Sequence, residues 1–162
     1  MTVHNRPESE RFWAKVVKGP RPSDCWIWTG AIADDGYGRF WVRRDGRQRA
    51  LRPQRFAWEQ ATGNQLQPGV VLLHACDVPI CVHATADELS HLGAGTQSQN
   101  MIDRSRKGRH GSASSFRWRG TGREQLVAQS LALRAAVISH GWDESIVRPL
   151  LNGHDAEAPT LF

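Results

Sequence analysis

Cysteine is scarce in this 162-residue sequence, which has three, at positions 25, 76 and 81. An odd number argues against a framework of disulfides. The chain also lacks an apolar run long enough to span a membrane, and its first residues lack the hydrophobic segment of a signal peptide. We therefore expect an intracellular, reducing setting, cytoplasmic and nucleoid-associated, or nuclear in a eukaryote, in which the thiols stay free to bind metal.

Acidic residues are almost missing from two stretches of the chain. Overall, 21 Lys and Arg stand against 16 Asp and Glu, which gives a net charge of +5. Residues 39–55 carry seven arginines and a single acid, Asp45, while residues 104–123 carry seven Lys or Arg and no acid. Phosphate binding is the usual use of such blocks, although they can also be solvated surface. A polyanionic partner is therefore expected.

Hydrophobic periodicity predicts a mixed α+β fold. Apolar residues at helical spacing indicate a helix over residues 8–17. Alternation over residues 37–52, interrupted by Asp45-Gly46, indicates a β-hairpin with a tight turn. Pro53 suits the first turn of a helix that ends before Gly63.

The hairpin is rich in side chains that read DNA. A twisted β-ribbon fits the major groove, where Arg can reach guanine and Gln can reach adenine. The residues expected to contact DNA are Arg39, Arg43, Arg44, Arg47, Gln48 and Arg49, together with Arg106, Lys107 and Arg109 in the second basic block. The aromatic residues around the hairpin are expected in the core: Trp26, Trp28, Phe40 and Trp41.

A dense group of metal-binding residues follows an apolar strand expected at residues 70–73. His74 comes directly after that strand and two residues before Cys76, and four residues separate Cys76 from Cys81. Thiolate is a strong zinc ligand, and the short loop between the two thiols favours their binding to one tetrahedral ion. His74 would then be held next to that metal.

A second short strand, expected at residues 89–94, leads into a helix over 96–107. Thr96 and Gln99 have the spacing of a capping box, which would open this helix. Asn100 would lie on its first turn, facing back toward the strand that carries His74.

The order of these residues resembles the ββα-metal, or HNH, endonuclease superfamily, and within it the His-Cys box homing endonucleases and their small phage and bacterial relatives. The resemblance covers roughly residues 12–110, and segments 25–30 and 36–38 also look like the part that precedes the box. The matching residues of the box are His74, Cys76, Cys81, His91, Leu92, Gly95, Thr96, Asn100 and Asp103, with Gly108 and Arg109 closing it.

Cys76, Cys81 and His91 would supply three ligands of a structural zinc, with Cys25 as the fourth. A closed Cys₃His site has no open position for a substrate, which is why its role is expected to be structural. The loop between Cys81 and His91 is longer than in the family pattern and lacks its proline, so His83 is an alternative ligand. Cys25 has an alternative too, as a small buried hydrophobic residue.

The resemblance implies hydrolysis of a phosphodiester to 5′-phosphate and 3′-hydroxyl ends. His74 would act as the general base, since a neutral imidazole can take a proton from water at physiological pH. Asn100 would bind a catalytic Mg²⁺ through its amide oxygen. Arg55 is a candidate for holding the scissile phosphate, but a plain surface salt bridge is equally compatible with its position.

The remainder of the chain predicts two helices after a basic linker. Residues 1–110 would form the DNA-binding sheet and nuclease core, 111–122 the linker, and 123–162 a helical segment. A helix over 123–139 ends at His140-Gly141, and Asp143 is a candidate cap for a second helix, Glu144 to Leu151. These helices could form a helix-turn-helix, pair two subunits into a homodimer or pack on the core.

The expectation from sequence is therefore a Mg²⁺-dependent, site-specific endonuclease that cuts double-stranded DNA, with an α+β fold of the ββα-metal type and a structural Zn²⁺. A homodimer would match a palindromic site. The alternative is a zinc-stabilised DNA-binding regulator without catalysis, which would keep the cysteines and arginines but have no use for His74 and Asn100 together.

Overall fold

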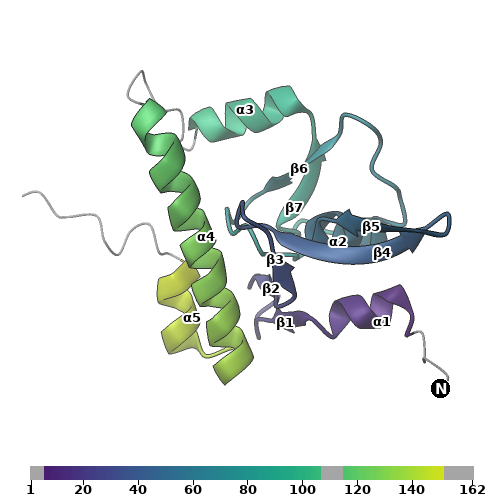
Figure 1. The fold of residues 1–162 in the computed structure, drawn as a ribbon, viewed down its shortest axis with the longest axis horizontal. Helices are drawn as coiled ribbons and strands as arrows, with labels where there is room; N and C mark the ends of the chain where they lie inside the picture. Colours follow the sequence, from purple (N-terminus) through teal and green to yellow (C-terminus); the bar gives the residue numbers. More distant parts are fainter. Residues whose placement is uncertain (1–5, 107–114, 152–162) are drawn as a thin grey trace, which may run out of the picture.

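The computed structural model describes residues 6–106 and 115–151, apart from the side chains of 103–106 and 115–121. In chain order its elements are α1 (Glu8–Trp13), β1 (Val16–Lys18), β2 (Trp26–Trp28), β3 (Ala31–Ile32), β4 (Gly38–Arg44), β5 (Arg47–Leu51), α2 (Pro53–Thr62), β6 (Val71–His74), β7 (Leu92–Gly95), α3 (Gln97–Arg106), α4 (Ser115–His140) and α5 (Glu144–Leu151). The strands form three small antiparallel sheets, β1–β2, β3–β4–β5 and β6–β7 (Figure 1). The expected α+β class with C-terminal helices is confirmed.

A cluster of buried aromatic rings joins the first half of the chain. Phe12 of α1 is fully buried, and its ring centroid lies 5.2 Å from that of Trp28, 5.3 Å from that of Phe40 and 4.7 Å from that of Phe56. These rings come from α1, β2, β4 and α2, so one contact set fixes four elements. Gly38 allows this packing, since a Cβ there would lie 2.6 Å from the Trp28 ring.

The β4–β5 hairpin has the predicted bounds and turn. Asp45 and Gly46 both have positive φ, 52° and 72°, which is the backbone of a two-residue type I′ turn. The register pairs Val42 with Arg49 and Arg43 with Gln48. Pro53 begins α2 and Gly63 ends it in the left-handed conformation, as the sequence predicts.

Trp41 does not lie in the core, and that prediction is wrong. Side chains alternate along a strand, and burial of Phe40 and Val42 turns Trp41 outward. Its side chain is 50% exposed. The other aromatic residues predicted to lie inside, Trp26, Trp28 and Phe40, all belong to or pack against the core.

The first helix is shorter than expected from the sequence. α1 ends at Trp13, and Val16 and Val17 form β1 instead of a last helical turn. These residues pair with β2, Val16 opposite Trp28 and Val17 opposite Ile27. β-Branched side chains fit a strand better than a helix, and here the partner strand decides between the two.

The second strand of the β6–β7 pair begins later than expected, at Leu92. Before it, the chain makes a turn in which the Leu89 N–H donates to Asp87 Oδ1 over 3.0 Å. Leu89, predicted as part of the strand, is instead exposed. The two strands pair Leu72 with Ala94 and His74 with Leu92.

The C-terminal helices pack against the core, which was one of the alternatives left open by the sequence. Leu133 and Val137 of α4 and Val147 of α5 are buried members of the main hydrophobic cluster. Helix α5 has the predicted bounds, and Asp143 caps it by accepting the Ser145 N–H over 2.9 Å. Helix α4 begins at Ser115, earlier than the predicted 123, so it includes part of the expected linker. Extension of an established helix adds one hydrogen bond per residue, which favours this longer helix.

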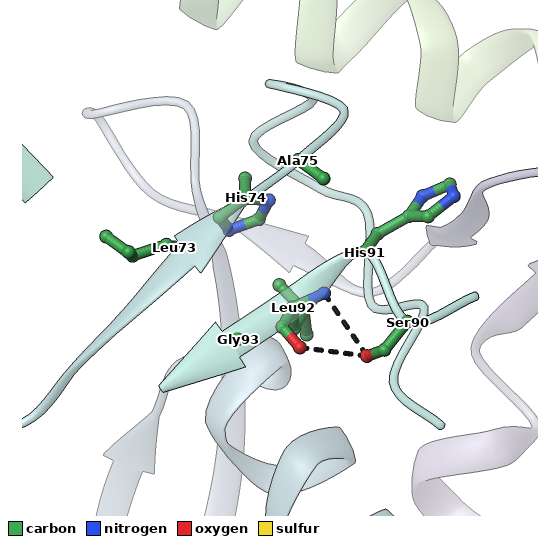
Figure 2. A pocket seen from close by; sticks show the side chains of 7 residues that line it. All are labelled: Leu73, His74, Ala75, Ser90, His91, Leu92 and Gly93. Atoms are coloured by element: carbon green, nitrogen blue, oxygen red, sulfur yellow. Dashed lines mark hydrogen bonds between the residues drawn. The ribbon is translucent and has the colours of Figure 1, made fainter. Parts of the chain in front are cut away.

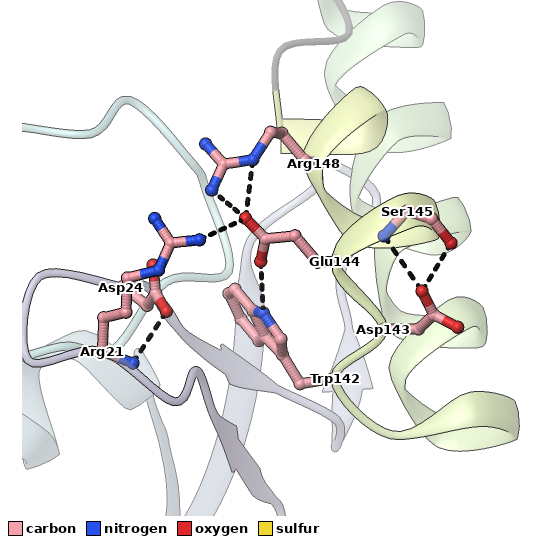
Figure 3. Close-up of polar contacts among 7 residues, drawn as sticks. All are labelled: Arg21, Asp24, Trp142, Asp143, Glu144, Ser145 and Arg148. Carbon is pink, nitrogen blue, oxygen red and sulfur yellow. Dashed lines mark hydrogen bonds and ion pairs between the residues drawn. The ribbon is translucent and has the colours of Figure 1, made fainter.

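Figure 3 shows how α5 is tied to the loop before β2. Glu144 Oε1 lies 2.7 Å from the guanidinium of Arg21, while Glu144 Oε2 accepts a hydrogen bond from the Trp142 indole over 3.1 Å. Arg148 also pairs with Glu144. In the same loop, the Arg21 N–H donates to Asp24 over 2.9 Å. None of the helices in the described part of the chain has the length and apolar character that a membrane span requires.

Removal of the Phe12 ring should destabilise the fold. We expect Phe12→Ala to lower the free energy of unfolding by about 3–5 kcal/mol, since it removes a fully buried ring and leaves a cavity. Leu131→Ala, at a side chain that is 46% exposed, is the control and should change stability by less than about 0.5 kcal/mol. Urea denaturation of the two variants measures both values, and equal effects would contradict the central role of Phe12.

Candidate metal centre and adjoining pocket

The metal centre is built where the segment around Cys81 runs alongside β2. Ile27 and Cys81 form an antiparallel bridge, the Trp28 N–H donates to Ile80 O over 2.9 Å, and the Val82 N–H donates to Trp26 O over 2.8 Å. Cys25, just before β2, is thereby brought close to Cys81. Both are buried in the hydrophobic core.

The β6–β7 pair delivers the other two donors. Cys76 follows the end of β6 by two residues, and His91 directly precedes β7. A hydrogen bond from the Ala75 N–H to His91 O, 2.9 Å long, joins the two segments at this point. The ligand atoms of Cys25, Cys76, Cys81 and His91 all lie within 4.8 Å of one another, which is the predicted Cys₃His set.

The spacing of these donors fits a tetrahedral zinc. His91 Nδ1 lies 3.6 Å from Cys25 Sγ and 3.4 Å from Cys81 Sγ. Zinc bonds of about 2.3 Å to sulfur and about 2.0–2.1 Å to nitrogen place the two ligand atoms about 3.6 Å apart at the tetrahedral angle. The cluster could therefore hold a zinc ion.

The second nitrogen of His91 has a partner of its own. Nε2 lies 3.0 Å from the backbone carbonyl of Ser23, which lets it donate its proton there and leaves Nδ1 free to bind metal. Histidines that bind metal almost always donate their other N–H in this way. The loop before β2 therefore fixes both Cys25 and the orientation of His91.

His83, the alternative ligand, lies outside the cluster. Its ring stacks on Trp26 at a centroid distance of 4.3 Å, and its Nδ1 lies 2.7 Å from the carbonyl of Asp24. Burial and the nearby His91 lower the pKa of His83, which favours the neutral imidazole. His83 thus packs beside the centre, and His91 is the residue that the structure brings to the three thiols.

Hydrogen bonds within the cluster polarise the thiols. The pKa of Cys76 lies well below its usual range, because Cys25 and Cys81 hydrogen-bond to its sulfur. The pKa of Cys25 is raised by its hydrogen bond with Cys76, and that of Cys81 by burial. The thiolate is the form that binds metal, so Cys76 provides one ready ligand and a bound cation would deprotonate the others.

An open pocket of about 290 Å³ adjoins the centre (Figure 2). It is lined by residues 73–75 at the end of β6 and residues 90–93 at the start of β7. His74 and His91 both line it, so the pocket lies beside the metal cluster. The imidazole of His74 hydrogen-bonds to the Cys76 thiol and contacts the ring of Tyr37 edge-on, with centroids 6.3 Å apart. Its position therefore depends directly on the cluster.

Helix α3 brings Asn100 back toward β6 and β7. The predicted capping box is present: Gln99 N–H donates to Thr96 Oγ1 over 3.1 Å, and Thr96 N–H donates to Gln99 Oε1 over 2.7 Å. Among residues 97–102, Asn100 alone is not exposed, so its side chain lies on the covered side of the helix. Gly95 allows the tight passage into α3, since a Cβ there would lie 2.7 Å from Leu73.

The arginines predicted to hold phosphate or DNA differ in their partners and in their exposure. The guanidinium of Arg55 contacts Glu59 over 3.2 Å and donates to Leu66 O over 2.8 Å, which is the salt-bridge alternative left open by the sequence.

Arg44 pairs with Glu8 of α1 over 2.5 Å. Arg106 ends α3 but its side chain is outside the described residues, as are Lys107 and Arg109. Of the hairpin residues predicted to contact DNA, Arg43, Arg47, Gln48 and Arg49 are exposed, and Arg39 and Arg44 are half-buried.

Tyr37, to which the sequence assigned no role, lies next to His74, and Arg52 in turn contacts Tyr37. The Arg52 guanidinium lies 4.3 Å from the Tyr37 ring centroid and 2.8 Å from Asp35 Oδ2. Tyr37 is the only tyrosine in the chain and lies between two glycines, which was the signal available in the sequence. Tyr37 thus links His74 to the Arg52–Asp35 ion pair.

The metal centre predicts one zinc per chain. His91→Gln should abolish zinc binding, since it removes a ligand from a closed set of four, whereas His83→Gln should retain a full equivalent. Elemental analysis of the purified variants, with circular dichroism to verify folding, makes the comparison. Full zinc in the His91 variant together with loss in the His83 variant would reverse the assignment.

The Asp35 carboxylate should make the stability of the fold depend on pH. Although burial raises its pKa, the hydrogen bonds from the Tyr37 N–H and Arg52 outweigh this and hold the pKa below its ordinary value. A carboxyl group whose pKa is lower in the folded state than in the unfolded state stabilises the fold at pH values above its unfolded-state pKa, which is about 3.9 for Asp. This stability is lost as the pH falls through the folded-state pKa. Asp35→Asn should therefore be less stable than the parent at neutral pH.

That difference should shrink below about pH 4, where the parent carboxyl is itself protonated. Urea titrations of both proteins at a series of pH values give the difference directly, and any acid effect common to both cancels. Asp34→Asn, at a carboxylate that is 83% exposed, is the control. A difference that is constant with pH would contradict the role of the charge.

Two proteins of Escherichia phage T7 are similar to this chain, although no family model matches it and no solved structure matches it significantly. Protein 7.7 is 31% identical over 117 residues, which is 72% of this chain and 78% of that protein. Protein 2.8 is 31% identical over 87 residues, which is 54% of this chain and 53% of that protein. The chain therefore belongs to the family of phage T7 protein 7.7.

Proposed function

We propose that this chain is a Mg²⁺-dependent endonuclease of the ββα-metal (HNH) type that hydrolyses double-stranded DNA. The observation that carries the proposal is the place of His74. It ends β6, lines an open pocket and lies two residues before a member of the Cys₃His cluster. An imidazole that is both accessible and rigidly held suits a general base.

Zinc in this proposal is structural. The four protein donors complete a tetrahedral set, so no position is left for water or substrate. The ion would join the loop before β2 to the segment around Cys81 and to both strands of the β6–β7 pair. It would thus fix His74 without taking part in hydrolysis.

His74 accepts the proton of the attacking water, and the pocket beside it receives the phosphate. Asn100, on the inward face of α3, offers an amide oxygen, which is a hard donor of the kind that Mg²⁺ prefers. When bound there, Mg²⁺ would stabilise negative charge on the phosphate and on the departing 3′ oxygen. Asn100 is the one protein ligand proposed for this ion, and Mg²⁺ usually keeps several of its waters and takes only one or two protein ligands.

The basic hairpin supports DNA as the substrate. Arg43, Arg47 and Arg49 are exposed on β4 and β5, and a duplex passing them would be held by its phosphates. A second copy of the chain is the further partner we propose, because two copies place two active sites on one duplex. The 5′-phosphate and 3′-hydroxyl ends follow from the family resemblance.

A zinc-stabilised DNA-binding regulator is the second candidate. It accounts for the Cys₃His cluster and the basic hairpin but leaves His74 and the capped, inward-facing Asn100 without a role. Cleavage separates the two candidates.

We expect zinc-loaded protein to convert supercoiled plasmid to linear DNA in Mg²⁺, and to leave it supercoiled in the same buffer without Mg²⁺. His74→Ala should lower the rate at least about 100-fold, which is the scale of general-base catalysis. Asn100→Ala should lose activity through loss of Mg²⁺, so more Mg²⁺ should partly restore it. Gel electrophoresis of time courses gives these rates, and linear product in place of nicked circles is the result expected of a homodimer.

Arg55→Ala and His83→Gln are the matched controls, because neither residue is part of the proposed machinery. Both should retain cleavage once their zinc content is verified. Tight, Mg²⁺-independent binding of DNA without cleavage of any plasmid or phage DNA would favour the regulator instead.

A further inference from the structure

The outer face of the β4–β5 hairpin carries an uncovered indole. Trp41 is 50% exposed, and the core needs its neighbours Phe40 and Val42 but not its side chain. Its backbone does have a structural role, since the guanidinium of Arg11 donates to Trp41 O over 3.3 Å. About half of the residue is therefore left open to solvent, on the face of the strand that does not meet the core.

Cations surround this indole. Arg39 and Arg43 lie two residues away on the same strand, so they share its face. Across the strand pair, the register sets Ala50 directly opposite Trp41 and Gln48 opposite Arg43. The small Ala50 offers little side chain to cover the ring. Neither β4 nor β5 contains an acidic residue, and Glu8 of α1 contacts the backbone N–H of Arg43 and the side chain of Arg44.

This surrounding distinguishes Trp41 from the other large exposed apolar residues of the described chain. Leu131 and Ile138 lie on α4 and Met101 and Ile102 on α3, whereas Trp41 is the one placed in a sheet face between arginines. An exposed aromatic ring flanked by cations matches the two parts of a nucleotide, a flat base and an anionic phosphate. The positive charge of this surface and the flat shape of its indole therefore both favour a nucleotide as the ligand.

We propose that Trp41 stacks on an unpaired base of DNA, while Arg39 and Arg43 hold the phosphates on either side. An intact duplex offers a protein the edges of its bases in the groove, and the flat faces are already stacked on one another. An indole gains most from a base that has left the stack. The substrate class is therefore DNA with unpaired bases, such as a bulge, a gap or a locally opened duplex.

This inference rests on the proposed function for its biological meaning, but a measurement of DNA binding alone tests it. The experiment uses zinc-loaded His74→Ala protein in buffer without added Mg²⁺, in which the proposed cleavage lacks both its base and its cation. Fluorescein-labelled oligonucleotides of one sequence are compared as a single strand, a matched duplex and a duplex with a central bulge. Fluorescence anisotropy gives the affinity of each.

We expect the bulged duplex and the single strand to bind more tightly than the matched duplex. Adding Trp41→Ala should weaken binding to these two forms by about 5- to 150-fold, the range set by stacking on one base, and leave the matched duplex within about twofold. Trp41→Phe should retain most of the affinity, because phenylalanine still stacks. Quenching of tryptophan fluorescence on binding should diminish in the Phe variant while binding persists.

Arg43→Ala is the matched control on the same face, and it should weaken all three DNA forms alike and reduce the dependence on salt. A preference of the parent for the matched duplex would overturn the inference. So would an equal effect of Trp41→Ala on all three forms, or no effect on any. Failure of the plasmid assay would refute the proposed nuclease while leaving these binding results intact.

Discussion

The structure depends on the contact between β2 and the segment around Cys81. Two backbone hydrogen bonds and one bridge hold these pieces together, although more than fifty residues separate them in the chain. The contact brings Cys25 to Cys81, and the strand pair β6–β7 then closes the cluster with Cys76 and His91. A zinc in that position would connect three segments that otherwise share few backbone hydrogen bonds, which is the usual way small domains supplement a modest core.

The rigid and the accessible parts of the molecule lie side by side. Cys25 and Cys81 belong to the same buried cluster as the aromatic rings of α1, β2, β4 and α2, so the metal centre is anchored in the best-packed region. His74 lies beside the metal centre and lines an open pocket together with His91. In the proposed nuclease, a base held by a rigid support but exposed to solvent could meet a large polymer, because such a substrate would approach the surface without entering a deep cleft.

Local rules of sequence predicted much of this arrangement. The Thr96–Gln99 capping box, the Asp45-Gly46 turn and the bounds of α2 and α5 each depend on a few neighbouring residues, and each is confirmed. The four members of the metal cluster were also predicted, since their residue types and spacing limit the choice.

Features that depend on distant contacts were missed or left open. The end of α1 is set by the pairing of β1 with β2, and the outward position of Trp41 by which strand face meets the core. The choice of His91 over His83 depends on two carbonyl groups of the loop before β2. The contact of Tyr37 with His74 joins residues far apart in the chain, and no local pattern encodes it.

The proposed nuclease activity is tested most directly by the chemistry of the DNA ends that the zinc-loaded protein would leave. The proposed hydrolysis by an activated water would leave a 5′-phosphate and a 3′-hydroxyl, which are the ends that a DNA ligase joins. We expect the purified cleavage products to be religated without prior treatment by a kinase or phosphatase. Ends that require such treatment, or no cleavage by fully zinc-loaded protein in Mg²⁺, would contradict the proposal.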